Sequence, residues 1–482
     1  MLILLLILIP FISAALLIAG GSKMTKGLAM GSALAELAIA ATALIMFSNG
    51  NTALLSFDQP WIQTLGIRFH IAADGISLLM ILLTTLLLPV ILYASFGREQ
   101  KNAHVYYALM LMMQGAMIGA FTALDGFLFY IFWELALIPI YFIILVWGGE
   151  NRQKITFKFF IYTLFGSLFM LLAFIYIYLQ APERSFDIEV LYRTARSLSV
   201  GEQGWIMAAF FLAFAVKMPV FPFHTWQPNT YFTAPTSGLM MLSAIMSKMA
   251  TYGLIRWVIP MVPDGMAEYG YICIALSVFS VIYASCISVV QKNFKYLIAY
   301  SSIAHVSLIA AGLMAANIQS LQGGLIEMLS HAINTIGLFY ACDIIMSRAG
   351  TADMAGLGGI RAVDSRFAFL FFIVVLSAVA LPFTTGFVGE FLLIVGIFKA
   401  NAIAASIAGL SVILGVVYMF RSFQTIMLGE TNALTANFRP IDNREKTVLI
   451  IIVIFIIAIG VYPKPILDIT EQSVKTLLEG IK

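Results

Sequence analysis

The chain has 482 residues, of which 61% are hydrophobic and only 11% are charged, and its mean hydropathy is +0.97. A soluble domain carries charge on about a quarter of its residues. The composition therefore excludes a soluble domain and predicts a polytopic membrane protein. The net charge of +3 gives no indication of a nucleic-acid partner.

Hydrophobic runs of about 20 residues are long enough to cross a bilayer as helices. Fourteen such runs predict an all-α polytopic membrane protein with about 14 transmembrane helices. The first run lacks a basic leader and a small-residue cleavage site, so we expect it to remain as a span. The predicted spans are residues 1–20, 27–48, 74–97, 104–124, 126–148, 155–180, 203–222, 234–259, 267–290, 296–316, 320–347, 365–398, 402–428 and 447–462.

Basic residues are distributed unevenly between the loops on the two sides of the predicted bundle. The side reached after the first span holds 16 lysines and arginines, and the other side holds 9. Cytoplasmic loops carry the excess of basic residues in membrane proteins. Both termini are therefore predicted to face away from the cytoplasm.

The sequence contains no motif for a bound cofactor or metal. The cysteines, Cys273, Cys286 and Cys342, lie in apolar stretches without CxxC spacing, so neither an iron–sulfur cluster nor a disulfide framework is encoded. A Walker loop, a glycine-rich nucleotide fingerprint and an HExxH motif are also absent from the sequence. We expect no metal and no cofactor-binding residues in this chain.

Lys217 is the most unusual residue of the predicted spans. It lies within FFLAFAVKMPVFPF, two residues before Pro219 and five before Pro222. A charge inside the bilayer costs about 2.5 to 3.5 kcal/mol on insertion scales, so it is by default a functional group. Prolines interrupt helices, and broken helices that carry a charge form ion sites in transporters. The alternative is a lysine that extends its amine to the membrane surface from the end of a span.

A second predicted span is also interrupted. The segment VVLSAVALPFTTGFVGEFLLIVGIFKA is expected to break at Pro382 and Gly386, and the carboxylate of Glu390 lies beyond the break. Two broken helices in one chain suggest paired structural repeats. The repeat is inferred from where the breaks fall, because the residues around them do not match one another.

Five more ionisable residues lie inside predicted spans: Glu134, Lys248, His305, Glu327 and His331. Glu327 and His331 are four residues apart, so on a helix they share a face and could exchange a proton through a water. A single buried histidine is more often an ordinary core residue. Acids, lysines and histidines in successive spans are nevertheless the composition of a proton relay.

The predicted relay would work by electrostatics. A carboxylate that approaches a buried lysine favours the charged form of the lysine. Movement of Glu134 toward or away from Lys217 would therefore switch that lysine between holding and releasing a proton. Nothing in the sequence supplies energy, so the drive must come from an ion gradient or from another subunit. Two further acids inside spans, Glu36 and Asp343, are interpreted as structural.

Seven stretches of the sequence form a specific set of motifs: FYIFWELALIPIYFII, KMPVFPFHTW, APTSG, SKMATYGLIR, LIAYSSIAH, MLSHAIN and LPFTTGFVGEF. Together they resemble the antiporter-like membrane subunits of respiratory complex I, the proton-translocating NADH:quinone oxidoreductase, and most closely the bacterial M type. The resemblance covers about residues 74–465. The L type carries a long lateral helix after its spans, whereas only about 20 residues follow Tyr462 here.

The resemblance implies a fold of fourteen spans with two inverted five-helix repeats, each containing a discontinuous helix. We expect N-terminal helices over residues 1–100, repeats over 101–260 and 261–430, and a last helix with its tail over 431–482. It further implies that NAD, FMN, iron–sulfur clusters and quinone are bound by other subunits. The implied partners are the neighbouring L and N types, including the lateral helix of the L type, in the bacterial inner membrane.

The resemblance also implies roles for particular residues. A glutamate–lysine pair maps onto Glu134 and Lys217, a central lysine onto Lys248, histidines onto His305 and His331, and a terminal acid onto Glu390. Two departures are visible. Where such subunits usually read W-L-P-D-A-H-T-E-A-P-T, the segment from Trp226 to Thr236 has Asn229, Tyr231 and Thr233 in place of the acid, histidine and acid. At Glu327 a glutamine is commoner.

Three other interpretations compete with a proton-pumping subunit. The chain is also similar to subunits of multisubunit sodium/proton antiporters. A stand-alone secondary transporter would use the same broken helices to bind a solute, and would be active when purified by itself. A purely structural membrane scaffold would tolerate neutral residues at Lys217 and Lys248.

Overall fold

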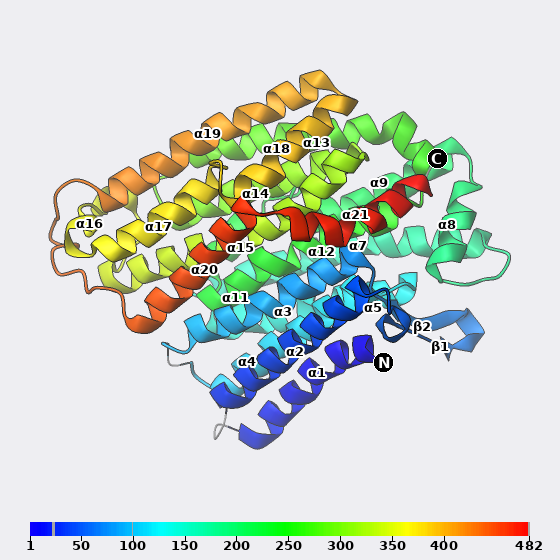
Figure 1. Cartoon of the computed structure of the whole chain (residues 1–482), viewed down its shortest axis with the longest axis horizontal. Coiled ribbons are helices and arrows are strands. Elements are labelled where there is room, and N and C mark those ends of the chain that lie inside the picture. Colours follow the sequence, from blue (N-terminus) through cyan, green and yellow to red (C-terminus); the bar gives the residue numbers. More distant parts are fainter. Residues whose placement is uncertain (22–24, 99, 481–482) are drawn as a thin grey trace.

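A computed structural model describes residues 1–21, 25–98 and 100–480, which form a bundle of long helices (Figure 1). Lys23 and Lys482, two of the basic loop residues, lie outside the described residues. The helices are α1 (Leu2–Gly20), α2 (Thr25–Ser48), α3 (Gly75–Ser95), α4 (Ala103–Thr122), α5 (Gly126–Leu135), α6 (Leu137–Trp147), α7 (Arg152–Gln180), α8 (Ile188–Arg196), α9 (Val200–Lys217), α10 (Gln227–Thr233), α11 (Thr236–Met241), α12 (Lys248–Gly253), α13 (Pro263–Val290), α14 (Phe294–Met314), α15 (Ile318–Ala349), α16 (Ile360–Val363), α17 (Ser365–Ala378), α18 (Thr385–Ala400), α19 (Ala402–Met427), α20 (Asn443–Val461) and α21 (Lys464–Glu479).

Each of the fourteen predicted spans coincides with one described helix or with consecutive helical segments. Twelve helical segments of the described chain are long and apolar enough to cross a membrane, and α20 with α21, which meet at an angle of 64°, make a thirteenth if they form one span. The shorter helices α17 and α18 account for the remaining predicted span. The predicted helical membrane fold is therefore confirmed.

A two-stranded hairpin is the exception to the all-α prediction. Strands β1 (Ser56–Ile62) and β2 (Ile67–Ala72) pair in antiparallel register, with Ser56 opposite Ala72 and Phe57 opposite Ile71. Gly66 closes the turn with a φ of 61°, in the left-handed region that glycine adopts without strain. The segment is too polar for a span, so the pattern of apolar runs predicts no element there.

Side-chain caps fix where several helices begin. Asp74, Asp125 and Asn293 accept hydrogen bonds from backbone N–H groups in the first turns of α3, α5 and α14. Ser199 and Glu202 form a reciprocal capping box at the start of α9. These caps satisfy amides that helix geometry leaves unpaired.

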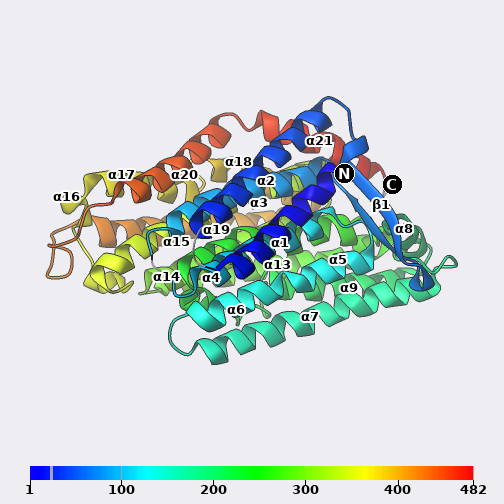
Figure 2. The ribbon, with the colours of Figure 1, turned by 90° about the horizontal axis from the view of Figure 1, so that it is seen from below.

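Both termini lie at the end of the bundle that carries the β hairpin and α8 (Figures 1 and 2). In Figure 2, α7 runs along one side of the bundle and α20 along the opposite side. Helices α12, α14 and α15 are almost entirely buried between these sides. The amphipathic α21 packs across α3, and Ser473 accepts a hydrogen bond from the backbone of Gly75 at 3.0 Å.

Candidate functional site: a buried series of ionisable residues

Lys217 is the last residue of α9, and its side chain is buried. Helix α9 stops here because Pro219 and Pro222 follow in a non-helical stretch that continues to α10. The end of a helix carries partial negative charge, which favours an ammonium group. Nζ of Lys217 donates a 3.2 Å hydrogen bond to the carbonyl of Trp133 and lies 3.9 Å from the centre of the Trp133 ring.

Glu134 follows Trp133 in the chain, but among the described residues no ion pair joins its carboxylate to Lys217. Its Oε1 atom is buried and has no hydrogen-bond partner among the described residues. The carboxylate sits where α5 ends and α6 begins, shortly before Pro139. The helix is interrupted at Ala136, between α5 and α6, and the carbonyl of Trp133, in the last turn of α5, accepts the hydrogen bond from Lys217.

Lys248 lies at the centre of the bundle and is fully buried. It follows a π-helical turn, Leu242–Met246, a distortion that is frequent at functional sites. Its Nζ donates to the carbonyl of Ser243 at 2.8 Å and to the hydroxyl of Ser247 at 3.2 Å, and lies 2.6 Å from Nδ1 of His331. A protonated lysine has only donors, so the imidazole nitrogen that faces it acts as the acceptor.

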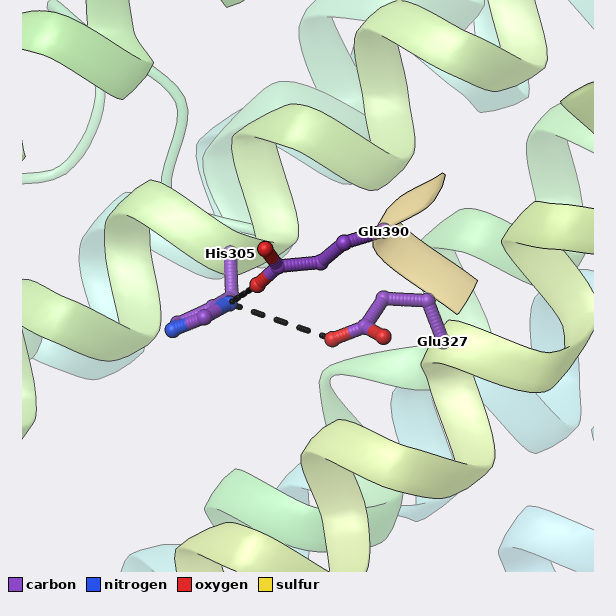
Figure 3. A group of neighbouring side chains, drawn as sticks. All are labelled: His305, Glu327 and Glu390. Carbon is purple, nitrogen blue, oxygen red and sulfur yellow. Dashed lines mark ion pairs between the residues drawn. The ribbon is translucent and has the colours of Figure 1, made fainter. Parts of the chain in front are cut away.

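His305, Glu327 and Glu390 meet from three helices, α14, α15 and α18 (Figure 3). Nδ1 of His305 lies 2.9 Å from Oε1 of Glu390 and 3.8 Å from Oε1 of Glu327. The centre of the His305 ring is also 5.8 Å from that of His331. Lys248, the two histidines and the two acids therefore form one continuous cluster, which we call the central cluster.

Two small cavities adjoin His305, each with a volume of about 10 Å³. One is lined by Glu390 and Tyr418, and the other by Glu327 and His331. A space of this size holds about one water molecule when polar groups surround it. Each cavity thus has room for about one water molecule beside His305.

The structure thus brings all seven predicted ionisable residues into two neighbouring groups. Glu134 and Lys217 form the first, and the central cluster holds the other five. Helix α9, which carries Lys217, packs against α12, which carries Lys248. Glu327 and His331 share a face of α15 as predicted, but each contacts a different partner: His305 for Glu327 and Lys248 for His331.

One predicted helix break is misplaced. The chain between α17 and α18 is non-helical around Pro382, with positive φ at Ala380 (54°) and Phe383 (71°). Gly386 lies after this break, in the first turn of α18. A Cβ atom at Gly386 would come within 2.2 Å of the carbonyl of Ser377, so the glycine permits close packing of α18 against the end of α17.

Several polar residues around the site carry no signal in the sequence. Ser243 and Ser247 bind Lys248, and serines in apolar helices do not indicate such a role. Trp133 precedes Glu134 in one of the family motifs, but only the fold assigns its carbonyl and ring to Lys217. Glu36 is fully buried on α2, and neither carboxylate oxygen has a hydrogen-bond partner among the described residues.

The uncharged segment before Thr236 also has defined contacts. Asn229 accepts a 3.0 Å hydrogen bond from the hydroxyl of Tyr296, and Tyr231 and Thr233 are buried. Near them, Arg98 and Asp343 form an ion pair at 2.6 Å, and Thr236 donates a hydrogen bond to Asp343. These contacts fit the structural role predicted for Asp343.

Comparison with known proteins shows the family. Residues 123–417 match the family described as NADH:quinone oxidoreductase/Mrp antiporter, TM. A protein of Rickettsia conorii named NADH-quinone oxidoreductase subunit M is 38% identical over 437 residues, which is 90% of this chain and 88% of that protein. The chain belongs to the NADH:quinone oxidoreductase/Mrp antiporter membrane family.

Solved structures of this family have the same fold. A chain of respiratory complex I from Thermus thermophilus superimposes with a TM-score of 0.91 at 26% identity, covering 100% of both chains. A chain of the Mrp complex from Dietzia superimposes with a TM-score of 0.88 at 20% identity, covering 99% of this chain and 98% of that chain. The second likeness is one of fold alone.

Proposed function

We propose that the chain is the M-type membrane subunit of a proton-translocating NADH:quinone oxidoreductase, and that its buried ionisable residues move protons while quinone is reduced elsewhere in the complex. The observation that carries the proposal is the central cluster within a chain 38% identical to an NADH-quinone oxidoreductase subunit M. Isolated buried charges are costly, whereas a connected series of titratable groups can pass a proton along.

Glu134 and Lys217 form the first station of the proposed relay. In the structure the ammonium group is held by a carbonyl and an aromatic face and has no carboxylate partner among the described residues. A rotation of Glu134 toward Lys217 would stabilise the charged lysine, and its withdrawal would favour release of the proton. The proposed rotation would take place at the interruption between α5 and α6.

The central cluster forms the rest of the proposed relay. A proton released from Lys248 has His331 as its nearest acceptor at 2.6 Å. Transfer onward passes from His331 to His305 through a water, and from His305 to Glu390 at 2.9 Å. The order of stations in the direction of pumping is Glu134, Lys217, Lys248, His331, His305 and the acids Glu327 and Glu390.

The proposal assigns the other parts of the reaction to other chains. NAD, FMN, iron–sulfur clusters and quinone would be bound by other subunits of the complex. The neighbours in the membrane would be the L and N types, with the lateral helix of the L type along this chain. The complex would lie in the bacterial inner membrane, with both termini of this chain on the periplasmic side.

A subunit of a multisubunit sodium/proton antiporter is the alternative function. The matched family includes Mrp antiporters, but the likeness to the solved Mrp complex is one of fold at 20% identity, whereas the chain is 38% identical to an NADH-quinone oxidoreductase subunit M. Purification would separate the two, because a subunit M co-purifies with NADH-oxidising activity, and an antiporter subunit does not.

The experiment that tests the proposal is Lys217→Ala in the assembled complex. Inverted membrane vesicles are assayed for NADH:quinone activity and for quenching of an acid-sensitive dye. We expect both to fall strongly, because redox chemistry and pumping are coupled. Lys475→Ala, at an exposed lysine of α21, is the matched control and should behave as wild type. Wild-type values of both quantities in Lys217→Ala would refute the role of this lysine.

A further inference from the structure

Glu327 lies at an unusually close crossing of α15 and α18. Gly389 makes this approach possible, because a Cβ atom there would lie 2.5 Å from Oε2 and 2.8 Å from Cα of Glu327. Glu390 is the next residue along α18. The glycine that immediately precedes Glu390 thus makes room for Glu327.

The two carboxyl groups face the same imidazole (Figure 3). A ring nitrogen of His305 and one carboxylate oxygen each of Glu327 and Glu390 all lie within 4.8 Å of one another. Glu327 is 1% exposed, and its Oε2 atom has no hydrogen-bond partner among the described residues. A buried, unpaired carboxylate oxygen this close to a second carboxylate is unfavourable unless a proton or another cation is held between them.

The charges of the central cluster determine how many protons are needed. Two carboxylates contribute two negative charges, and a protonated Lys248 compensates one of them. His331 faces the ammonium group of Lys248 at 2.6 Å and is therefore an acceptor rather than a second cation. One further proton remains to be placed, and the groups left to hold it are Glu327, Glu390 and His305.

We propose that Glu327 and Glu390 form a single proton-binding site, in which one exchangeable proton is shared between two carboxyl groups and His305. The proposal rests on the proposed function and deepens it: the last station of the relay in this chain contains two acids instead of one. Either acid can keep the proton while the other is ionised. Glu327 faces the cavity of His331, and Glu390 faces the cavity of Tyr418, so the shared proton can arrive at one acid and leave from the other.

The other titratable groups that face this site come from three helices. Lys248 of α12 and His331 of α15 lie on the side of Glu327. Tyr418 of α19 lies on the side of Glu390, where its hydroxyl donates to Ser301 at 3.2 Å. None of these three lies between the two carboxyl groups, whereas His305 contacts both.

The test compares Glu327→Gln, Glu390→Gln and the double variant in the assembled complex, with dye quenching normalised to NADH oxidation and to the amount of complex. We expect each single variant to keep part of the pumping. The double variant should lose roughly fivefold more than the product of the two single losses, because residues that share one function are not additive. Glu36→Gln, at a buried acid outside the cluster, is the control and should pump as wild type.

A pH profile separates a proton-binding role from a structural one. In Glu327→Gln the site has lost one of the two carboxyl groups that hold the proton, so the alkaline limit of pumping should move to lower pH. The Glu36→Gln profile should not move. A wild-type profile and wild-type pumping in Glu327→Gln, or losses in the double variant equal to the product of the single losses, would overturn the proposal.

Sodium is the competing occupant of the site. At constant ionic strength, replacing sodium by choline should leave the pumping of the wild-type complex unchanged. Pumping that requires sodium in wild type but not in Glu327→Gln would assign the site to sodium and overturn the shared proton. Failure of the proposed function has a different signature, since Lys217→Ala would then pump as wild type whatever the acids do.

Discussion

The two groups of buried charge in this chain differ in how their members are partnered. At the first, Lys217 contacts a carbonyl and an indole ring, and Glu134 does not reach it. In the central cluster every member has an ionisable neighbour, from Lys248 at 2.6 Å from His331 to His305 at 2.9 Å from Glu390. We call the first group an open contact, because its acid and its lysine do not meet, and the second a closed one, because each of its members lies beside another ionisable group.

This difference suggests that the two groups have different roles in proton transfer. An open contact responds to movement, because closing the gap between Glu134 and Lys217 changes the charge that the lysine prefers. A closed series conducts, because each proton acceptor already lies within reach of a donor. The pair of Glu134 and Lys217 has no net charge when its two groups hold one titratable proton between them. The central cluster has no net charge when its five groups hold two such protons.

Lys248 is the residue whose loss should have the largest effect. Lys248→Ala removes the cation of the central cluster and leaves the nearby polar groups without their donor, so we expect pumping to fall by about tenfold or more. Lys248→Arg keeps the positive charge, but arginine does not release a proton in proteins. We therefore expect the Lys248→Arg complex to assemble but not to pump in vesicle assays. Normal pumping in this variant would show that Lys248 supplies only a fixed positive charge.

Trp133→Phe probes the open contact and should have a smaller effect. The backbone carbonyl that accepts from Lys217 is retained, and phenylalanine keeps a weaker aromatic face. A cation–π contact is worth about 0.5 to 2 kcal/mol, so we expect pumping to fall by roughly twofold to fivefold. Phe174→Leu, at a buried aromatic residue of α7, controls for packing, and an equal loss in both variants would remove any special role of the indole.

An ion pair outside both groups should affect stability and leave pumping unchanged. Asp187 lies 2.7 Å from Nδ1 of His70, and this hydrogen bond raises the pKa of His70. Burial opposes ionisation of Asp187, but the hydrogen bond from His70 leaves the pKa of that carboxyl lowered. Stability from the histidine is complete below its ordinary pKa of about 6.5 and is lost as pH rises, and stability from the acid is present above about pH 4.

Asp187→Asn should therefore destabilise the complex near pH 6 and much less at pH 9. The expected decrease is roughly 1 to 3 °C in the thermal midpoint at the lower pH. Thermal unfolding of the purified complex at the two pH values measures it. An equal decrease at both would mean that the contribution of Asp187 does not depend on a charged histidine.

The uncharged segment should give the smallest effect. Asn229→Ala with Thr233→Ala removes no titratable group, so pumping should remain within roughly twofold of wild type. Proton uptake would then use Glu134 or the central histidines. A large pumping defect with normal assembly would show that this segment carries protons without ionisable side chains, and the contrast between the two groups would no longer describe the whole path.

The sequence predicts much of the fold, because each span is a long apolar run with few charges. It also singles out the seven ionisable residues, since a charge in an apolar segment is visible without a structure. Their partners are not predictable in this way. Whether Lys217 meets Glu134 or the carbonyl of Trp133 depends on how α5 and α9 are rotated against each other, and apolar periodicity does not define that rotation.

Glycines illustrate the same limit. The sequence suggests that Gly386 belongs to a helix break, whereas in the structure it allows α18 to approach α17. Gly389 is unremarkable in the sequence, yet it lets the helices that carry Glu327 and Glu390 come together. In both cases the requirement comes from an atom on another helix, and no local sequence signal reports it.

The ratio of protons moved to NADH oxidised decides whether the buried charges of this chain carry protons. It is measured in proteoliposomes that contain the purified complex, with wild-type chain and with Lys217→Ala combined with Lys248→Ala. We predict that the double variant either stops turning over or moves fewer protons for each NADH oxidised, because both groups of this chain are interrupted. An assembled variant complex with the wild-type ratio and rate would show that these lysines take no part in proton transfer.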